Sequence, residues 1–185
     1  IPVDSIRLAG RPVANSELNQ AVKRSAWNKN YPLWNFPGRS LLLLSGAVGI
    51  GLAFWALRSA PLTCVVLFVS YYVVLVTVAL VPTFGGSMNM VLVVMPTLLF
   101  VTTLETSIHL ANYWRFNAQT DPQNAVVKAV RMATMPTFLA SFMSATGLAS
   151  LMTSSLTPVY DFGLYAAIGS MIAFVVVLYG MPSLL

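Results

Sequence analysis

The chain has 185 residues, of which 57% are apolar and only 8% are charged, and its formal net charge is +5. Soluble domains carry roughly 25% charged residues, so this composition excludes a soluble globular protein and predicts an integral membrane protein. The ten basic residues lie outside the apolar segments and form no stripe, which argues against nucleic acid as a partner. The single cysteine, Cys64, lies within an apolar run and offers neither a disulfide framework nor a metal cluster, so no cofactor is expected.

Residues 1–40 are mixed in polarity and are expected to form the end of an extracytoplasmic domain. The first thirteen residues suit an extended segment, and a helix capped by Asn15 or Ser16 is expected to run to about Asn30. A soluble linker is the alternative for that helix. Aromatic residues then precede the first apolar run, as is typical of the membrane–water interface. Because the chain begins at Ile1 with a polar segment, we expect it to be a piece of a longer polypeptide.

Two apolar segments follow and are predicted to cross the membrane. The first covers residues 41–57, and the second covers about 61–81 and is rich in valine and leucine. Both fall in the range of roughly 17–25 residues that a membrane-spanning helix needs. The Pro-Thr-Phe-Gly-Gly-Ser sequence at 82–87 predicts a turn that reverses the chain.

The third predicted span covers about 88–113 and carries the most informative residues of the chain. Residues 59–104 contain no charged side chain, and Glu105 and the only histidine, His109, come directly after them. A carboxylate inside a span costs roughly 2.5–3.5 kcal/mol, so it is expected to face protein, water or a partner. The four-residue spacing places Glu105 and His109 on one helix face, within reach of each other. The charged form of a buried carboxylic acid is disfavoured, so Glu105 is a candidate for binding and releasing a proton.

A polar loop is expected after Arg115, and Asp121-Pro122 is expected to start a short amphipathic helix that ends near Thr134. Val126, Val127 and Val130 lie on one side of this segment, and Lys128 and Arg131 lie on the other. Such a pattern predicts a helix at the membrane surface. Pro136 is expected to break this helix.

The fourth and fifth predicted spans, about 137–152 and 159–181, are rich in small residues. Small residues let membrane helices approach closely, so Ser144, Gly147, Gly163 and Ala167 are predicted to be helix-packing positions. The connections at 58–60 and 114–136 hold four basic residues, whereas those at 82–87 and 153–158 hold none. By the positive-inside rule, the third span therefore ends in the cytoplasm. The sequence predicts an all-α membrane protein with five transmembrane helices, a surface amphipathic helix and a short N-terminal remnant of an extracytoplasmic domain.

The order of these parts resembles half of a transporter of the resistance–nodulation–division (RND) superfamily, in the branch of the mycobacterial membrane protein large (MMPL) family. The resemblance rests on Leu-Ala-Gly-Arg-Pro-Val at 8–13, on the five spans, and on Leu-Glu-Thr-Ser-Ile-His-Leu at 104–110. That last segment is similar to the family's Val-Asp-Tyr-Ser-Ile-His-Leu motif. Glu105 falls on the aspartate that carries the proton, and Thr106 stands where a tyrosine often follows.

The resemblance implies a proton-driven exporter of hydrophobic or amphiphilic molecules in the cell (inner) membrane, with Glu105, His109 and Thr106 as the proton relay. It also implies membrane lipids as partners and a second half of the same polypeptide outside this chain. The same five-helix unit is known as a sterol-sensing domain, so a sterol- or lipid-sensing regulator is the alternative. An intramembrane hydrolase is disfavoured because the chain has one histidine and no Gly-x-Ser-x-Gly sequence, so no enzyme is expected.

Overall fold

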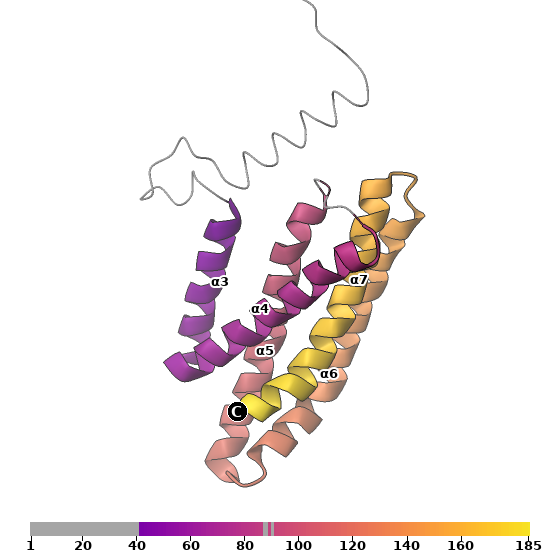
Figure 1. Cartoon of the computed structure of the whole chain (residues 1–185). Helices are drawn as coiled ribbons and strands as arrows, with labels where there is room; N and C mark the ends of the chain where they lie inside the picture. The colour runs from indigo at the N-terminus through magenta and orange to yellow at the C-terminus, as the bar shows by residue number, and fades with distance from the viewer. Residues whose placement is uncertain (1–40, 87–88, 90) are drawn as a thin grey trace, which may run out of the picture. The chain divides into compact units, whose positions relative to one another are not determined.

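The computed structural model describes residues 41–86, 89 and 91–185, and the segments expected within residues 1–40 lie outside the described residues. Residues 46–185 form one compact unit. All regular elements of the described residues are helical. The long helices are α3 (Leu41–Leu57), α4 (Ala60–Thr83), α5 (Met95–Thr120), α6 (Ala125–Ala149) and α7 (Thr157–Val175) (Figure 1).

Short helical segments of other types extend three of these helices. A 3-10 turn, η2 (Leu92–Val94), precedes α5, and another, η3 (Ser150–Thr153), continues α6. A π-helical segment, η4 (Val176–Gly180), and a 3-10 turn, η5 (Met181–Leu184), continue α7. With these extensions, four helical segments of the described residues are long and apolar enough to cross a membrane. They cover Ala60–Thr83, Leu92–Thr120, Ala125–Thr153 and Thr157–Leu184.

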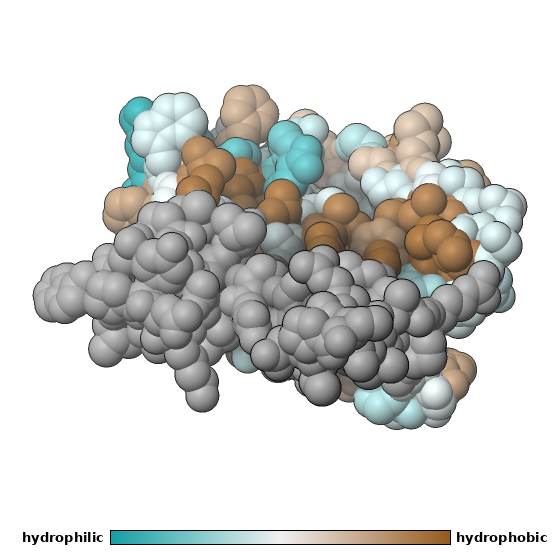
Figure 2. All heavy atoms as spheres, turned by 90° about the horizontal axis from the view of Figure 1, so that it is seen from above, coloured by the Kyte–Doolittle hydropathy of each residue, from teal (hydrophilic) through white to brown (hydrophobic). Residues whose placement is uncertain are grey.

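The outward faces of these helices carry large apolar side chains, which is the composition of a surface that contacts lipid. Trp55, Phe68, Met143 and Tyr179 each expose between 62% and 76% of their surface. In Figure 2 apolar side chains reach the surface of the bundle in several places. The chain is therefore a multi-pass membrane protein, and α3, at 17 residues, is a shorter apolar helix.

Within residues 46–185, α4, α5, α6 and α7 each pack against the next, and α7 returns to pack against α4. Among the described side chains of α3, the buried positions are Gly49, Ala53 and Leu57, which recur every four residues on one face. A side chain added at Gly49 would touch Phe100 and Leu104 of α5 at 3.4 and 3.9 Å. The backbone of α3 therefore lies close to α5.

Two glycines show why particular sequence positions allow this fold. Gly85 ends α4 in the left-handed conformation, at φ +74°, and its N–H donates to the carbonyl oxygen of Pro82 at 3.1 Å. Glycine adopts this conformation without steric cost, and the bond satisfies a carbonyl at the helix end. At Gly169, an added Cβ would lie 2.6 Å from Leu99 and 2.8 Å from Thr77. Glycine is needed there because α4, α5 and α7 meet at that point.

The connection between α5 and α6 is shorter than the sequence predicts. Helix α5 continues to Thr120, whereas a loop was expected after Arg115. Asn117 supports this extension, because its side-chain amide donates to the carbonyl oxygen of Tyr113 at 2.8 Å. Helix α6 begins at Ala125, so Asp121 belongs to the four-residue connection, where its carboxylate accepts a bond from the N–H of Asn124.

The prediction of a separate amphipathic surface helix ending at Pro136 is wrong. Helix α6 runs without interruption from Ala125 through Pro136 to Ala149, so this segment is the first part of the fourth span. Proline removes one bond to the carbonyl four residues earlier, but membrane helices tolerate that loss through local adjustment. The first turns of α6 lie at an angle to the rest of the helix (Figure 1), as expected of a helix kinked at proline.

The buried face of α6 also differs from the predicted one. Val127 exposes 69% of its surface, whereas the buried residues recur every four positions and are all small. They are Ala125, Ala129, Ala133, Thr137, Ser141 and Ala145. Since small residues allow close approach of helix backbones, this row is the surface through which α6 packs in the bundle. A search of the sequence for large apolar residues at helical spacing could not have found this packing surface, because its residues are small.

The two ends of the bundle differ in charge. Arg58, Arg115, Lys128 and Arg131 are the basic residues of the described part of the chain, and they lie where α3 and α5 end and α6 begins. We call this the basic end. The guanidinium of Arg115 donates to the carbonyl oxygen of Leu57, which places the ends of α3 and α5 side by side. The opposite end carries Asp161, whose carboxylate accepts a bond from the side-chain amide of Asn89.

Candidate functional site: a polar groove between α5 and α6

Glu105 lies near the middle of its span. Thirteen residues separate it from Leu92, where the apolar helical segment begins, and ten separate it from Arg115 at the basic end. At 1.5 Å per residue these separations are roughly 20 Å and 15 Å, compared with a hydrocarbon core about 30 Å thick. Glu105 therefore lies at the depth where a charged side chain is most costly.

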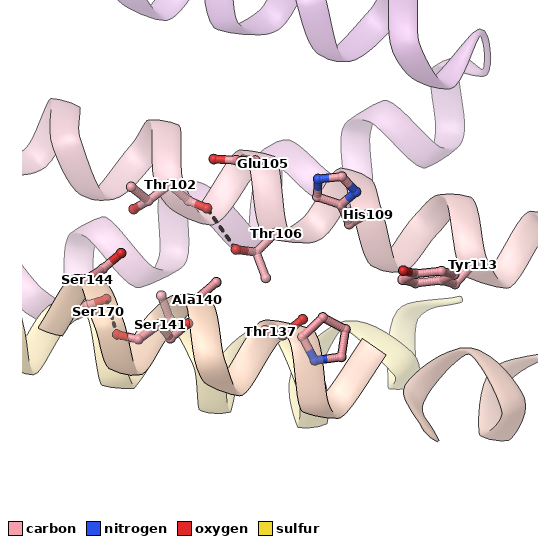
Figure 3. Close-up of a pocket in the computed structure, with 12 residues that line it drawn as sticks. Thr102, Glu105, Thr106, His109, Tyr113, Thr137, Ala140, Ser141, Ser144 and Ser170 are labelled. Carbon is pink, nitrogen blue, oxygen red and sulfur yellow. Dashed lines mark hydrogen bonds between the residues drawn. The ribbon is translucent and has the colours of Figure 1, made fainter. Parts of the chain in front are cut away.

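A groove runs along α5 and α6 and contains this carboxylate. Its volume is about 270 Å³, and it is partly open to the surface. Figure 3 shows the side chains that line it. Helix α7 forms its floor. The residues that line it are Thr102, Glu105, Thr106, His109 and Tyr113 of α5, Pro136, Thr137, Ala140, Ser141 and Ser144 of α6, and Ser170 and Ala173 of α7.

The structure brings the predicted relay residues Glu105, Thr106 and His109 to this one groove. Glu105 and His109 are both exposed, and among the described residues neither forms a hydrogen bond or an ion pair. Figure 3 shows the carboxylate directed away from the imidazole, so the two side chains share a face without touching. The hydroxyl of Thr106 donates to the carbonyl oxygen of Thr102 at 2.9 Å. Glu105 near the middle of the span and His109, one turn nearer the basic end, are thus the acid and the imidazole that line the groove.

The four predicted helix-packing residues occupy different environments. Gly163 lies at a close contact, since an added Cβ would be 2.8 Å from the carbonyl oxygen of Leu148. Ala167 is half-buried beside an apolar groove between α6 and α7. Ser144 and Gly147 are exposed, and a Cβ added at Gly147 would meet nothing within 4 Å.

Sequence reasoning missed several members of the groove. Tyr113 follows His109 by four residues, as His109 follows Glu105, so the same spacing rule could have placed it on this face. Thr137 and Ser141 belong to the small-residue row of α6, and they could be found only by knowing that this row faces α5. Pro136 was interpreted as a helix break and instead lines the groove.

Neither lysine nor arginine lines the groove among the described residues. The described basic residues all lie at the basic end, and one of them, Arg115, is already bonded to the Leu57 carbonyl. In the described part of the bundle, His109 is therefore the one side chain of the groove that can carry a positive charge and pair with the Glu105 carboxylate. An acid near the middle of the span, a histidine one turn nearer the basic end and several hydroxyls form an arrangement that can bind, hold and pass on a proton.

No protein-family model matches the chain, and no curated protein or solved structure matches it.

Proposed function

We propose that this chain is the membrane-embedded part of a transporter driven by the proton gradient, with Glu105 as its proton-binding group. The observation that carries the proposal is the position of Glu105, which lines a polar groove near the middle of a helix long enough to cross the membrane. A charged carboxylate at that depth costs roughly 2.5–3.5 kcal/mol on insertion scales. Because proton binding neutralises the side chain, it changes the energy of this part of the bundle.

In the groove, binding and release of a proton change the surroundings that the Glu105 side chain requires. With a proton bound, Glu105 can lie against apolar protein or lipid, and without it the carboxylate requires water or a hydrogen-bond donor. His109, one helical turn away, is a second group that can hold the proton. Alternating uptake from one side and release to the other would then alternate two arrangements of α5 and α6 and drive export.

The open side of the groove supports the proposal of a second helical unit. Glu105 and His109 are exposed in the described bundle, and a polar groove of this kind cannot face hydrocarbon without a large cost. A second half of the same polypeptide would cover the groove and could supply a donor to Glu105. The resemblance of residues 104–110 to the RND motif supports the same arrangement, with a hydrophobic or amphiphilic molecule as the exported substrate. The inner membrane of the cell is the proposed location.

Proton flux in proteoliposomes that contain the full-length protein tests this function. We expect Glu105→Gln, which keeps the shape and removes the titratable group, to lower gradient-driven flux by roughly 10²-fold or more. Glu105→Asp is expected to retain flux, because it keeps the acid. Asp121→Asn is the matched control, since it removes an acid from an exposed connection. Wild-type flux in the Glu105→Gln protein would reject the proposal.

A second candidate is a regulatory bundle that senses a sterol or another membrane lipid. It is favoured by an apolar groove of about 570 Å³ between α6 and α7, lined by Phe142, Ala145, Ala167 and Ile168 among others. That volume lies within the range typical of small-molecule sites, roughly 300–1,000 Å³. This function predicts that a photoreactive sterol labels α6 or α7 and that Ala167→Phe, which fills the groove, abolishes labelling. It also predicts labelling that survives Glu105→Gln.

A further inference from the structure

The hydroxyl groups of α6 fall into two classes. The hydroxyls of Thr134 and Thr146 each donate to the carbonyl four residues earlier, at 2.7 and 3.0 Å. Those of Thr137, Ser141 and Ser144 make no such bond and have no other hydrogen-bond partner among the described residues. The second class lies on successive turns of one face, and all three residues line the groove opposite Glu105 and His109.

Two of the residues that carry these free hydroxyls are nearly buried. Thr137 and Ser141 each expose 8% of their surface, and what they expose faces the groove. Serine and threonine in a helix ordinarily satisfy their hydroxyls on a preceding carbonyl, and buried polar groups nearly always have a partner. Neither hydroxyl oxygen is fully enclosed, so each is open to the groove and lacks a partner that water in the groove would supply.

The groove has room for this water and also suitable partners. Each water molecule takes roughly 30 Å³ in the liquid, so about 270 Å³ accommodates several. An internal water needs two to four polar partners. The hydroxyls of Thr137, Ser141 and Ser144 stand on one wall, and Glu105, His109 and the phenol of Tyr113 stand on the other (Figure 3).

A second groove extends this one away from the basic end. It measures about 290 Å³ and shares Thr102, Ser144 and Ser170 with the first, so the two grooves adjoin at these residues. Its lining adds Leu98 of α5 and Gly147 of α6. Because Gly147 has no side chain and a Cβ there would meet nothing, the groove stays open at this point. From Leu98 to Tyr113 the combined length is fifteen residues of helix, roughly 22 Å.

We propose that the hydroxyls of Thr137, Ser141 and Ser144 hold a row of water molecules that carries protons along the groove to and from Glu105. A proton enters past Gly147, passes through the waters at Ser144 to the Glu105 carboxylate and makes it neutral. It leaves through the waters between His109 and Tyr113 toward the basic end, which restores the carboxylate. This inference rests on the proposed function, but the presence of water can be measured without transport.

Cysteine labelling tests the row of waters directly. Cys64 is the only cysteine of this chain, so Cys64→Ser removes its thiol, and any cysteine elsewhere in the full-length protein is replaced by serine as well. In the full-length protein in native membranes, we expect a membrane-impermeant thiol reagent to label Ser144→Cys and Gly147→Cys, because thiolate forms only in contact with water. Met143→Cys is the control at the same depth, since Met143 is 66% exposed and lines neither groove. Equal labelling at all three positions, or none at positions 144 and 147, would overturn the proposal.

Hydroxyl deletion supplies a second test, with controls of the same shape on the same helix. Thr137→Val removes a free hydroxyl, and we expect it to lower proton flux by roughly tenfold without loss of folded protein. Thr134→Val removes a hydroxyl that is already bonded to Val130, and we expect a change below about twofold. Equal effects of the two variants would contradict the row of waters. If Glu105→Gln loses flux but the groove cysteines are not labelled, only this inference is overturned. If the groove cysteines are labelled but Glu105→Gln has normal flux, the proposed function is overturned.

Discussion

The guanidinium of Arg115 donates a hydrogen bond of 2.6 Å to the carbonyl oxygen of Leu57, the last residue of α3. Leu57 precedes Arg58, which has a positive φ of 46°, at the abrupt turn into α4. The carbonyls at the end of a helix lack partners within the helix, so a side chain from α5 satisfies one of them. This bond joins the beginning of the bundle to the helix that carries Glu105.

Removing this bond is expected to destabilise the basic end. A hydrogen bond that involves a charged group contributes about 1.5–3 kcal/mol, so Arg115→Met should lower the free energy of unfolding by that amount. Arg131→Met is the control, because Arg131 is exposed on α6. Thermal unfolding in detergent measures both variants. A midpoint for Arg115→Met equal to that of Arg131→Met would show that the bond contributes nothing.

Alanine substitutions at two glycines are expected to change the stability of the protein in opposite directions. In Gly163→Ala the new Cβ would lie 2.8 Å from the backbone oxygen of Leu148, so α6 and α7 must separate. We expect a loss of about 1–3 kcal/mol of stability, the usual cost of overpacking. Gly147→Ala meets open space, and alanine favours the helix by roughly 1 kcal/mol over glycine. In detergent, the free energy of unfolding should therefore be higher than wild type for Gly147→Ala and lower than wild type for Gly163→Ala. The reverse order would refute the packing described.

Ser107 is expected to be replaceable without loss. It is fully buried on α5. Its hydroxyl oxygen is the one completely buried side-chain nitrogen or oxygen atom of the described residues that lacks a hydrogen-bond partner. Ser107→Ala removes that orphan group, so its stability should stay equal or rise by about 1 kcal/mol. Ser70→Ala is the comparison, because the equally buried Ser70 donates to the carbonyl oxygen of Val66 at 2.9 Å. A larger loss for Ser107→Ala than for Ser70→Ala would mean that Ser107 has an important partner.

The α5–α6 connection has a predictable pH dependence. The Lys128 ammonium, 2.8 Å from the Asp121 carboxylate, and the Asn124 amide lower the pKa of Asp121 below its ordinary value of 3.8. A carboxyl group with a lowered pKa in the folded protein adds stability above its unfolded pKa, and this stability is lost as the pH falls through the folded pKa. In Lys128→Met the pKa of Asp121 should rise toward the ordinary value. Titration of the Asp121 carboxyl by nuclear magnetic resonance measures it, and an unchanged midpoint would contradict the role of Lys128.

Much of the fold could be predicted from the sequence where long apolar runs define the helices. The first apolar segment was predicted at 41–57 and is the helix Leu41–Leu57, which is shorter than the four helical segments long enough to cross a membrane. The second was predicted at about 61–81 and is Ala60–Thr83. The prediction failed between Arg115 and Pro136. Polar residues there suggested a loop and a surface helix, but Asn117 bonds within α5, and the kinked α6 continues through Pro136.

The candidate site was only partly visible in the sequence, for a different reason. The spacing of Glu105 and His109 defines a face of one helix, and that needs no tertiary information. The opposite wall depends on which face of α6 turns toward α5, and that face is set by a row of small residues. Whether a hydroxyl such as that of Ser141 bonds to its own helix or stays free depends on its rotamer. Local sequence carries no signal for that choice.

The central claim is that Glu105 binds and releases a proton within the groove. Infrared difference spectroscopy of the full-length protein in membranes, between acidic and alkaline pH, tests it most directly because a protonated carboxyl group has its own carbonyl band. We predict a band that disappears at alkaline pH, is absent in Glu105→Gln and persists in Asp161→Asn. A spectrum that Glu105→Gln leaves unchanged would contradict the account.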